Sequence, residues 1–169
     1  LTIDSLRADV LAGKDNDGRL PNLAAFRDDS LRFNHARTPG SQTLTTLTSL
    51  FAGTYYSQQY WVTRPPSTNF WPHADESRRF PQILSDAGVA TFHVGATPWM
   101  INDFGVVRGF AEDQFIPPRG THFTTGALTV PPLLERLALV GDEPFFAYTH
   151  LLDAHYSVRP LARGKEPHE

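Results

Sequence analysis

The sequence predicts an α/β protein in which helices flank a largely parallel sheet. Three observations carry this prediction. Short apolar runs typical of strands alternate along the chain with segments whose apolar residues recur at helical spacing. Glycine, proline, asparagine and aspartate residues stand between these segments, where turns are expected. Hydrophobic residues make up 40% of the 169 residues and charged residues 20%, which is typical of a single globular domain.

The first half of the chain begins with a strand and then favours helices. Residues 1–3 resemble the last part of a buried strand. The spacing of apolar residues predicts amphipathic helices over residues 22–29 and 43–51, and Gly53 stands where the second of these should end. Between the two helices, alternating apolar and polar residues predict a short strand over 31–36.

The second half continues the alternation of helix and strand. The expected elements are a long aromatic loop over 55–71, helices over 76–87 and 128–140, strands over 89–94 and 145–151, and an irregular segment over 98–121. The last strand is a continuous apolar run, as expected for a strand buried on both faces. Because both ends of the chain look abrupt, we expect an α/β sheet that is incomplete at both ends.

Composition excludes several classes of function. The chain has no cysteine, so disulfide bonds, thiolate zinc sites and a cysteine nucleophile are ruled out. The formal net charge is −3, which gives no support to a basic nucleic-acid-binding surface. No apolar run approaches the roughly 20 residues that a membrane span needs.

Ligands of parallel sheets collect where strands reach their carboxyl ends, and this rule selects three places. They are Asp4, residues 95–97 and residues 150–155. Asp4 follows the first strand directly, where a carboxylate is suited to a hard cation. The alternative is a loop carboxylate that caps a turn or pairs with Arg7.

Hydroxyl groups gather at the start of the helix expected over 43–51. The segment 41–46 contains Ser41, Thr43, Thr45 and Thr46. The first turn of a helix favours an oxyanion or a bound phosphate or sulfate, so a hydroxyl there could act as a nucleophile. Serine and threonine are also preferred N-cap residues, and capping is the alternative interpretation.

The end of the last strand carries His150, Asp153 and His155. Two histidines and a carboxylate within six positions could ligate a metal ion or transfer protons. Alternatively, His150 only packs in the core and Asp153 only caps a turn. The residues alone leave both interpretations open.

Five segments of the chain carry a further pattern: residues 1–9 with Asp4, residues 21–33, residues 43–53, residues 87–110 and residues 145–156. In their order and spacing, these segments resemble the sulfatase-like branch of the alkaline phosphatase superfamily. The resemblance implies an alkaline-phosphatase-like fold, with residues 1–169 as the N-terminal portion of a single catalytic domain. It also implies that Asp4 is a metal ligand and that Thr43, ten positions before Gly53, stands at the nucleophile position.

The chain departs from the family pattern at several positions. Sulfatases use a cysteine or serine that is converted to formylglycine, and threonine cannot form that aldehyde. Threonine is the nucleophile of the related phosphoethanolamine and phosphoglycerol transferases and phosphodiesterases. Leu47 replaces a cationic residue that holds the substrate anion, Ser5 replaces a second metal-binding aspartate, and Thr97 replaces an asparagine.

The resemblance therefore implies a metal-dependent hydrolase or transferase that acts on phosphate or sulfate esters through a covalent threonine intermediate. The residues that it implies are Thr43 and His155 as catalytic groups, Thr97, His150 and Asp153 as substrate-binding groups, and Asp4 and Thr43 as metal ligands. The cofactor would be a divalent metal ion (Ca, Mg, Mn or Zn). The alternative is a catalytically impaired sulfatase-like domain with a binding or regulatory role, which Leu47 and Ser5 favour.

Partners and location are also expectations. The substrate is expected to be a small-molecule, lipid or sugar ester, and no nucleic acid is expected. The aromatic residues of 55–71 would either contact such a substrate or pack in the core. By resemblance alone, we expect a periplasmic, extracellular or membrane-anchored protein, with any anchor lying in segments outside this sequence.

Overall fold

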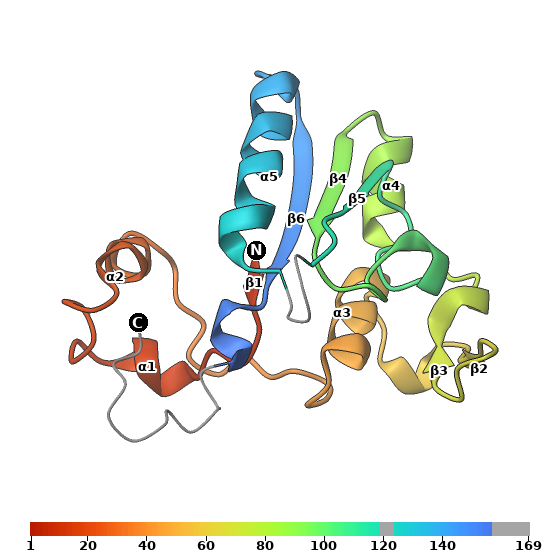
Figure 1. Cartoon of the computed structure of the whole chain (residues 1–169), viewed down its shortest axis with the longest axis horizontal. Helices are drawn as coiled ribbons and strands as arrows, with labels where there is room; N and C mark the ends of the chain where they lie inside the picture. The colour runs from red at the N-terminus through yellow and green to blue at the C-terminus, as the bar shows by residue number, and fades with distance from the viewer. Residues whose placement is uncertain (119–123, 157–169) are drawn as a thin grey trace.

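The computed structural model describes residues 1–118 and 124–156, and its centre is a parallel sheet of four strands (Figure 1). The strands are β1 (Thr2–Ile3), β6 (Phe145–Leu151), β4 (Ala90–Gly95) and β5 (Glu112–Phe115), in that spatial order. All three neighbouring pairs are parallel. The predicted α/β class with a largely parallel sheet is confirmed, and it is consistent with an alkaline-phosphatase-like fold.

Strand β6 lies between β1 and β4, and its two registers bring distant parts of the chain together. Thr2 is opposite His150 in one pair, and Ala90 is opposite Phe145 in the other. The backbone N–H of Asp4 continues the first ladder by donating to the carbonyl of Leu151 at 2.8 Å. The carboxyl ends of β1 and β6 therefore meet at one edge of the sheet.

Helices cover the sheet on both sides. Helix α4 (Phe80–Asp86) and helix α5 (Gly126–Val140) lie on opposite sides of it in Figure 1. Helices α1 (Ala8–Ala12) and α2 (Pro21–Asp28) lie together away from the sheet, and α3 (Thr43–Ala52) lies between β1 and the small antiparallel ribbon of β2 (Val62–Thr63) and β3 (Phe70–Trp71). The short 3₁₀ helices are η1 (Tyr56–Gln58), η2 (Pro72–Ala74), η3 (Asn102–Phe104) and η4 (Asp153–Tyr156).

Aromatic packing fixes α3 against the sheet. Phe51 is fully buried, and its ring meets Tyr148 of β6 edge-on at 5.0 Å and Phe110 at 5.4 Å between centroids. Such edge-to-face pairs add to the free energy gained by burying the rings. Gly53 ends the helix in the left-handed conformation, with φ of 67°, as its position in the sequence predicts.

Replacing Phe51 with alanine is expected to lower the free energy of unfolding by about 3–5 kcal/mol, because it opens a cavity among the rings of Phe80, Phe110 and Tyr148. Leu50→Ala is the matched control, since Leu50 is the preceding residue of the same helix and is half exposed. Its expected cost is about 1 kcal/mol or less. Urea denaturation followed by circular dichroism measures both, and equal losses would contradict this description of the core.

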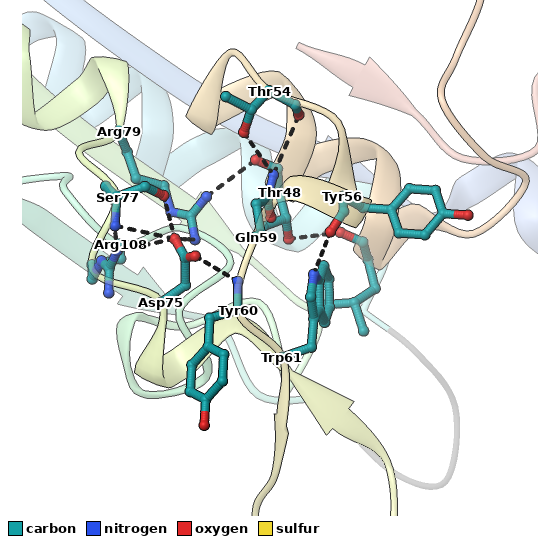
Figure 2. Close-up of polar contacts among 11 residues, drawn as sticks. Thr48, Thr54, Tyr56, Gln59, Tyr60, Trp61, Asp75, Ser77, Arg79 and Arg108 are labelled. Atoms are coloured by element: carbon teal, nitrogen blue, oxygen red, sulfur yellow. Dashed lines mark hydrogen bonds and ion pairs between the residues drawn. The ribbon is translucent and has the colours of Figure 1, made fainter.

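A buried polar network joins α3 to α4 and the ribbon (Figure 2). Arg79 is fully buried and donates to the carbonyl of Thr48 at 3.2 Å. The carboxylate of Asp75 accepts from the backbone N–H of Tyr60 at 2.7 Å and lies 3.7 Å from the Arg79 guanidinium. Burial, followed by the nearby charge of Arg108, lowers the pKa of Arg79 to about 10 against the opposing effect of Asp75.

Several expected elements differ from the structure. Helix α4 begins at Phe80 and not at residue 76, because the preceding residues are extended and contribute Asp75 and Arg79 to the buried network. The expected loop over 55–71 contains the β2–β3 ribbon. The segment 98–121 was expected to be irregular, but it contains β5.

The prediction of a strand over residues 31–36 is wrong. These residues have no regular secondary structure, and the side chains of Leu31 and Phe33 are 83% and 77% exposed. Alternation alone does not make a strand, because a strand needs a neighbour to pair with, and no strand of the described chain lies beside this segment.

Helix α5 contains Pro131 and Pro132 in its second turn. The helix was expected over 128–140, and the structure shows that it begins earlier, at Gly126. Within residues 1–118 and 124–156, no helix is both long enough and apolar enough to cross a membrane.

Candidate active site

Three polar side chains meet at the carboxyl ends of β1 and β6. Asp4 follows β1, Thr43 is the first residue of α3, and His150 lies near the end of β6. The hydroxyl of Thr43 donates to Asp4 Oδ2 at 3.2 Å, and His150 Nε2 lies 3.3 Å from the same oxygen. Thr43 and His150, which are far apart in the sequence, thus both contact the same carboxylate oxygen of Asp4.

The carboxylate of Asp4 is held in its ionised form. Its partial burial would raise the pKa, but hydrogen bonds from Ser5, His150 and Thr43 and the proximity of His150 together hold the pKa of Asp4 below its ordinary value. Ser5 donates to Asp4 Oδ1 at 2.9 Å and adopts a positive φ of 57°. Arg7 pairs with Asp9 at 2.5 Å, so the alternative in which it pairs with Asp4 does not occur.

Thr43 uses its hydroxyl differently from the other threonines of α3. Gln42 is the N-cap residue and makes no side-chain capping bond, so Thr43 is not a cap. The hydroxyl groups of Thr45, Thr46 and Thr48 donate to backbone carbonyls at 2.7–3.1 Å. Thr43 instead directs its hydroxyl to a carboxylate, where a hydroxyl nucleophile could lose its proton.

His150 is buried, with 5% of its surface exposed, and both ring nitrogens have partners. Nδ1 lies 2.6 Å from the hydroxyl of Thr2, and Nε2 lies 3.3 Å from Asp4. Burial lowers the pKa of His150 below its ordinary value, and the attraction of Asp4 only partly offsets this. His150 therefore contacts Asp4 as well as packing in the core.

Asp153 and His155 lie just beyond β6, in η4. The carboxylate of Asp153 accepts from the backbone N–H of Gly126, the first residue of α5, at 2.9 and 3.1 Å. The side chain of His155 is exposed, and its backbone N–H donates to the carbonyl of Leu152 at 3.0 Å. The structure thus gives Asp153 a partner at the start of α5 and leaves His155 at the surface.

Asp153→Ala is expected to lower the free energy of unfolding by about 1 kcal/mol, because the N–H of Gly126 at the start of α5 loses its acceptor. The control is Asp142→Ala, at the exposed turn after the same helix, with an expected change within about 0.5 kcal/mol. Urea denaturation compares the two variants. Equal stabilities would show that the contact of Asp153 with Gly126 contributes nothing.

Two other positions singled out in the sequence lie in the interior. Leu47 is 3% exposed and packs in the same core as Phe51. Thr97 is also buried, and its hydroxyl has no hydrogen-bond partner among the described residues.

Sequence reasoning missed the contact between Thr2 and His150. The alternation of strand residues was an available signal, because it places Thr2 and Asp4 on the same face. The partner could not be named without the register of β1 against β6.

A groove of about 420 Å³ lies between the first turn of α3 and the aromatic ribbon. Its lining includes Gln42, Tyr56, Trp61, Asn69, Phe70 and Trp71. Trp71 is buried and packs on Phe104 at 4.6 Å, whereas Tyr56 and Phe70 are exposed. Part of the aromatic segment therefore packs in the interior, and part of it is exposed beside this groove.

The oxygen atoms of Asp4 and Thr43 fit a hard divalent cation in kind, because carboxylate and hydroxyl oxygens are suitable ligands for such ions. Within the described part of the chain, no group of three or more histidine, aspartate or glutamate residues lies close enough together to hold a metal ion.

An all-parallel α/β sheet with polar groups gathered at its carboxyl edge is an arrangement typical of α/β enzymes. A comparison with family models matches residues 1–166 to the family described as Sulfatase. The chain belongs to the sulfatase family, whose members are hydrolases of sulfate esters that generally use a divalent metal ion. No curated protein and no solved structure matches the chain.

Proposed function

We propose that this chain carries the nucleophile of a metal-dependent hydrolase or transferase that acts on phosphate or sulfate esters through a covalent threonine intermediate. The observation that supports this most directly is the hydrogen bond from the Thr43 hydroxyl to Asp4 at 3.2 Å. A threonine hydroxyl is a weak nucleophile by itself, and an adjacent carboxylate can act as the acceptor of its proton.

In the proposed reaction, Thr43 Oγ1 attacks the phosphorus or sulfur atom of the ester as its proton moves toward Asp4. The bond from Oγ1 to phosphorus or sulfur forms, and the bond from that atom to the ester oxygen breaks. The N–H groups in the first turn of the ten-residue helix α3 face developing negative charge there. The leaving oxygen takes a proton from His155. Water releases the group in a hydrolase, and an acceptor alcohol takes it in a transferase.

Asp4 and Thr43 are the proposed ligands of a divalent cation, which could be Ca, Mg, Mn or Zn. When bound, such an ion would lower the pKa of a hydroxyl ligand and offset the charge of the substrate. His150 and Asp153 are proposed to shape the site and the loop that carries His155, and Thr97 stays a predicted substrate contact.

The proposed substrate is a small-molecule, lipid or sugar ester. The exposed aromatic side chains near Gln42, the residue before Thr43, offer a surface for its organic part. A periplasmic, extracellular or membrane-anchored location is proposed from the family resemblance alone.

One observation favours a second candidate function. Leu47, at the position where relatives of this kind hold the anion with a cation, is buried in the core. A domain without that charge would bind esters weakly and turn them over slowly. The second candidate is therefore a catalytically impaired sulfatase-like domain with a binding or regulatory role.

The test uses the full-length protein, stripped of metal and then supplied separately with Ca²⁺, Mg²⁺, Mn²⁺ or Zn²⁺. Turnover is measured with 4-nitrophenyl sulfate, 4-nitrophenyl phosphate and bis(4-nitrophenyl) phosphate. Acid quenching during turnover, followed by peptide mass spectrometry, is expected to find a sulfated or phosphorylated Thr43. Metal-dependent turnover without any adduct on Thr43 would exclude the covalent mechanism, and no turnover or metal binding would favour the second candidate.

A further inference from the structure

A continuous chain of hydrogen bonds runs from the core of the sheet to Asp4. The phenolic oxygen of Tyr148 lies 2.6 Å from the hydroxyl of Thr2, and that hydroxyl lies 2.6 Å from His150 Nδ1. His150 Nε2 then lies 3.3 Å from Asp4 Oδ2, the oxygen that also accepts from Thr43. Four hydrogen bonds thus connect the buried phenol to the hydroxyl of Thr43.

The chemistry of these groups determines which atom is the donor in each of the four hydrogen bonds. An ionised carboxylate can only accept, so His150 must carry its proton on Nε2 in order to donate to Asp4. In a neutral imidazole, Nδ1 is then an acceptor, and the hydroxyl of Thr2 must donate to it. The oxygen of Thr2 is left to accept from Tyr148, which has a proton to give. Each donor in this series of hydrogen bonds therefore has one acceptor.

We propose that Thr2 is a positioning residue, which acts by holding His150 in the tautomer that donates from Nε2 to Asp4. The inference rests on the proposed function, because it gives Asp4 and Thr43 their roles in the reaction. In the opposite tautomer, Nε2 would present a lone pair to the Asp4 oxygen. The carboxylate would then turn away, and Thr43 would lose its acceptor.

The backbone makes this arrangement rigid. Thr2 is directly opposite His150 in the parallel register of β1 and β6, and Tyr148 precedes His150 by two residues, on the same face of β6. The ring of Tyr148 packs edge-on against Phe51 of α3. Tyr148 and His150 are both almost fully buried, so water has little access with which to replace Thr2.

Thr2→Val removes the hydroxyl while keeping the β-branched shape that suits a strand. Thr149→Val is the matched control, because Thr149 is the buried neighbour of His150 and its hydroxyl has no partner among the described residues. Thr2→Ser restores the hydroxyl and is the rescue variant. All three are compared with the wild-type full-length protein at one fixed pH.

The first readout is the ¹⁵N NMR spectrum of the imidazole ring of His150, assigned by its loss in His150→Gln. The wild-type protein, Thr149→Val and Thr2→Ser are expected to show a protonated Nε2 and an unprotonated Nδ1. Thr2→Val is expected to show a mixture of the two tautomers. An unchanged spectrum in Thr2→Val would overturn the proposal whether or not the protein is an enzyme.

The second readout is turnover of the ester that the wild-type protein uses best. Thr2→Val is expected to lower kcat by about 10- to 100-fold and to change KM by less than about 3-fold, as for loss of a group that orients a metal or reacting ligand. Thr2→Ser is expected to recover most of the loss. If Thr2→Val does not fold, Thr2→Ala removes the same hydroxyl, and wild-type kcat with a wild-type spectrum in that variant would overturn the proposal.

Discussion

Replacing Thr43 with alanine is expected to lower kcat by about 10⁴-fold, because the variant has no oxygen with which to attack the ester. The covalent adduct on the peptide that contains residue 43 should disappear at the same time. Alanine is a good helix former, so α3 is expected to persist. Turnover of the best of the three nitrophenyl esters, measured on the metal-loaded full-length protein, gives the size of the loss.

Thr45→Ala is the matched control for this variant. Thr45 lies in the same turn of α3, but its hydroxyl donates to the backbone carbonyl of Gln42 at 3.0 Å and not to Asp4. Its kcat is expected to stay within about 3-fold of the wild-type value. Thr43→Ser keeps a hydroxyl and should retain measurable turnover. Equal activities of Thr43→Ala and the wild-type protein would remove Thr43 from the mechanism.

Asp4→Asn is expected to lower kcat by about 10³-fold and to weaken the binding of the activating cation. Asparagine has nearly the shape of aspartate but no charge, so the variant loses both a charged ligand and the acceptor for the proton of Thr43. A loss of this size corresponds to about 4 kcal/mol, within the several kcal/mol that a bound metal ion supplies to a transition state. Calorimetric titration with the cation and turnover measurements give the two effects separately.

The matched control is Asp9→Asn. Asp9 belongs to α1, and its carboxylate is exposed and paired with Arg7. Exposed ion pairs contribute little, so neither cation affinity nor kcat should change noticeably. Undiminished cation binding by Asp4→Asn would place the metal elsewhere, even if turnover fell.

The parts of the fold that the sequence predicted well are those with strong local patterns. The strands expected over 89–94 and 145–151 and the helix expected over 43–51 lie within a residue of β4, β6 and α3. Each is a run of apolar residues with a clear period or a clear end. Burial in a sheet or against it preserves such runs, so local pattern and tertiary structure agree.

Two errors came from segments whose structure depends on a partner. The residues of β5, Glu112–Phe115, are mostly polar, and their place at the edge of the sheet is set by pairing with β4. Residues 31–36 have the better strand pattern and no neighbouring strand within the described chain. Pairing over long distances in the sequence decided both cases, and a local pattern does not record it.

In the candidate site too, local pattern predicted some features, and others depended on pairing between distant segments. The rule that ligands collect at carboxyl ends of parallel strands selected Asp4 and the region of His150 from the sequence, and the structure places both beside Thr43. The partners of these groups depend on exact register and could not be inferred. Thr2 beside His150 and Gly126 beside Asp153 are examples.

The pairing of β1 with β6 has a consequence for how the protein is made. These strands are separated by more than 140 residues, so during synthesis the first strand waits without its neighbour until almost the whole described chain has left the ribosome. The candidate site is consequently among the last features of the described chain to form. A nascent chain halted before residue 145 would hold Asp4 and Thr43 but would lack the strand that brings His150 to Asp4, and its exposed apolar edge would be a natural target for chaperones.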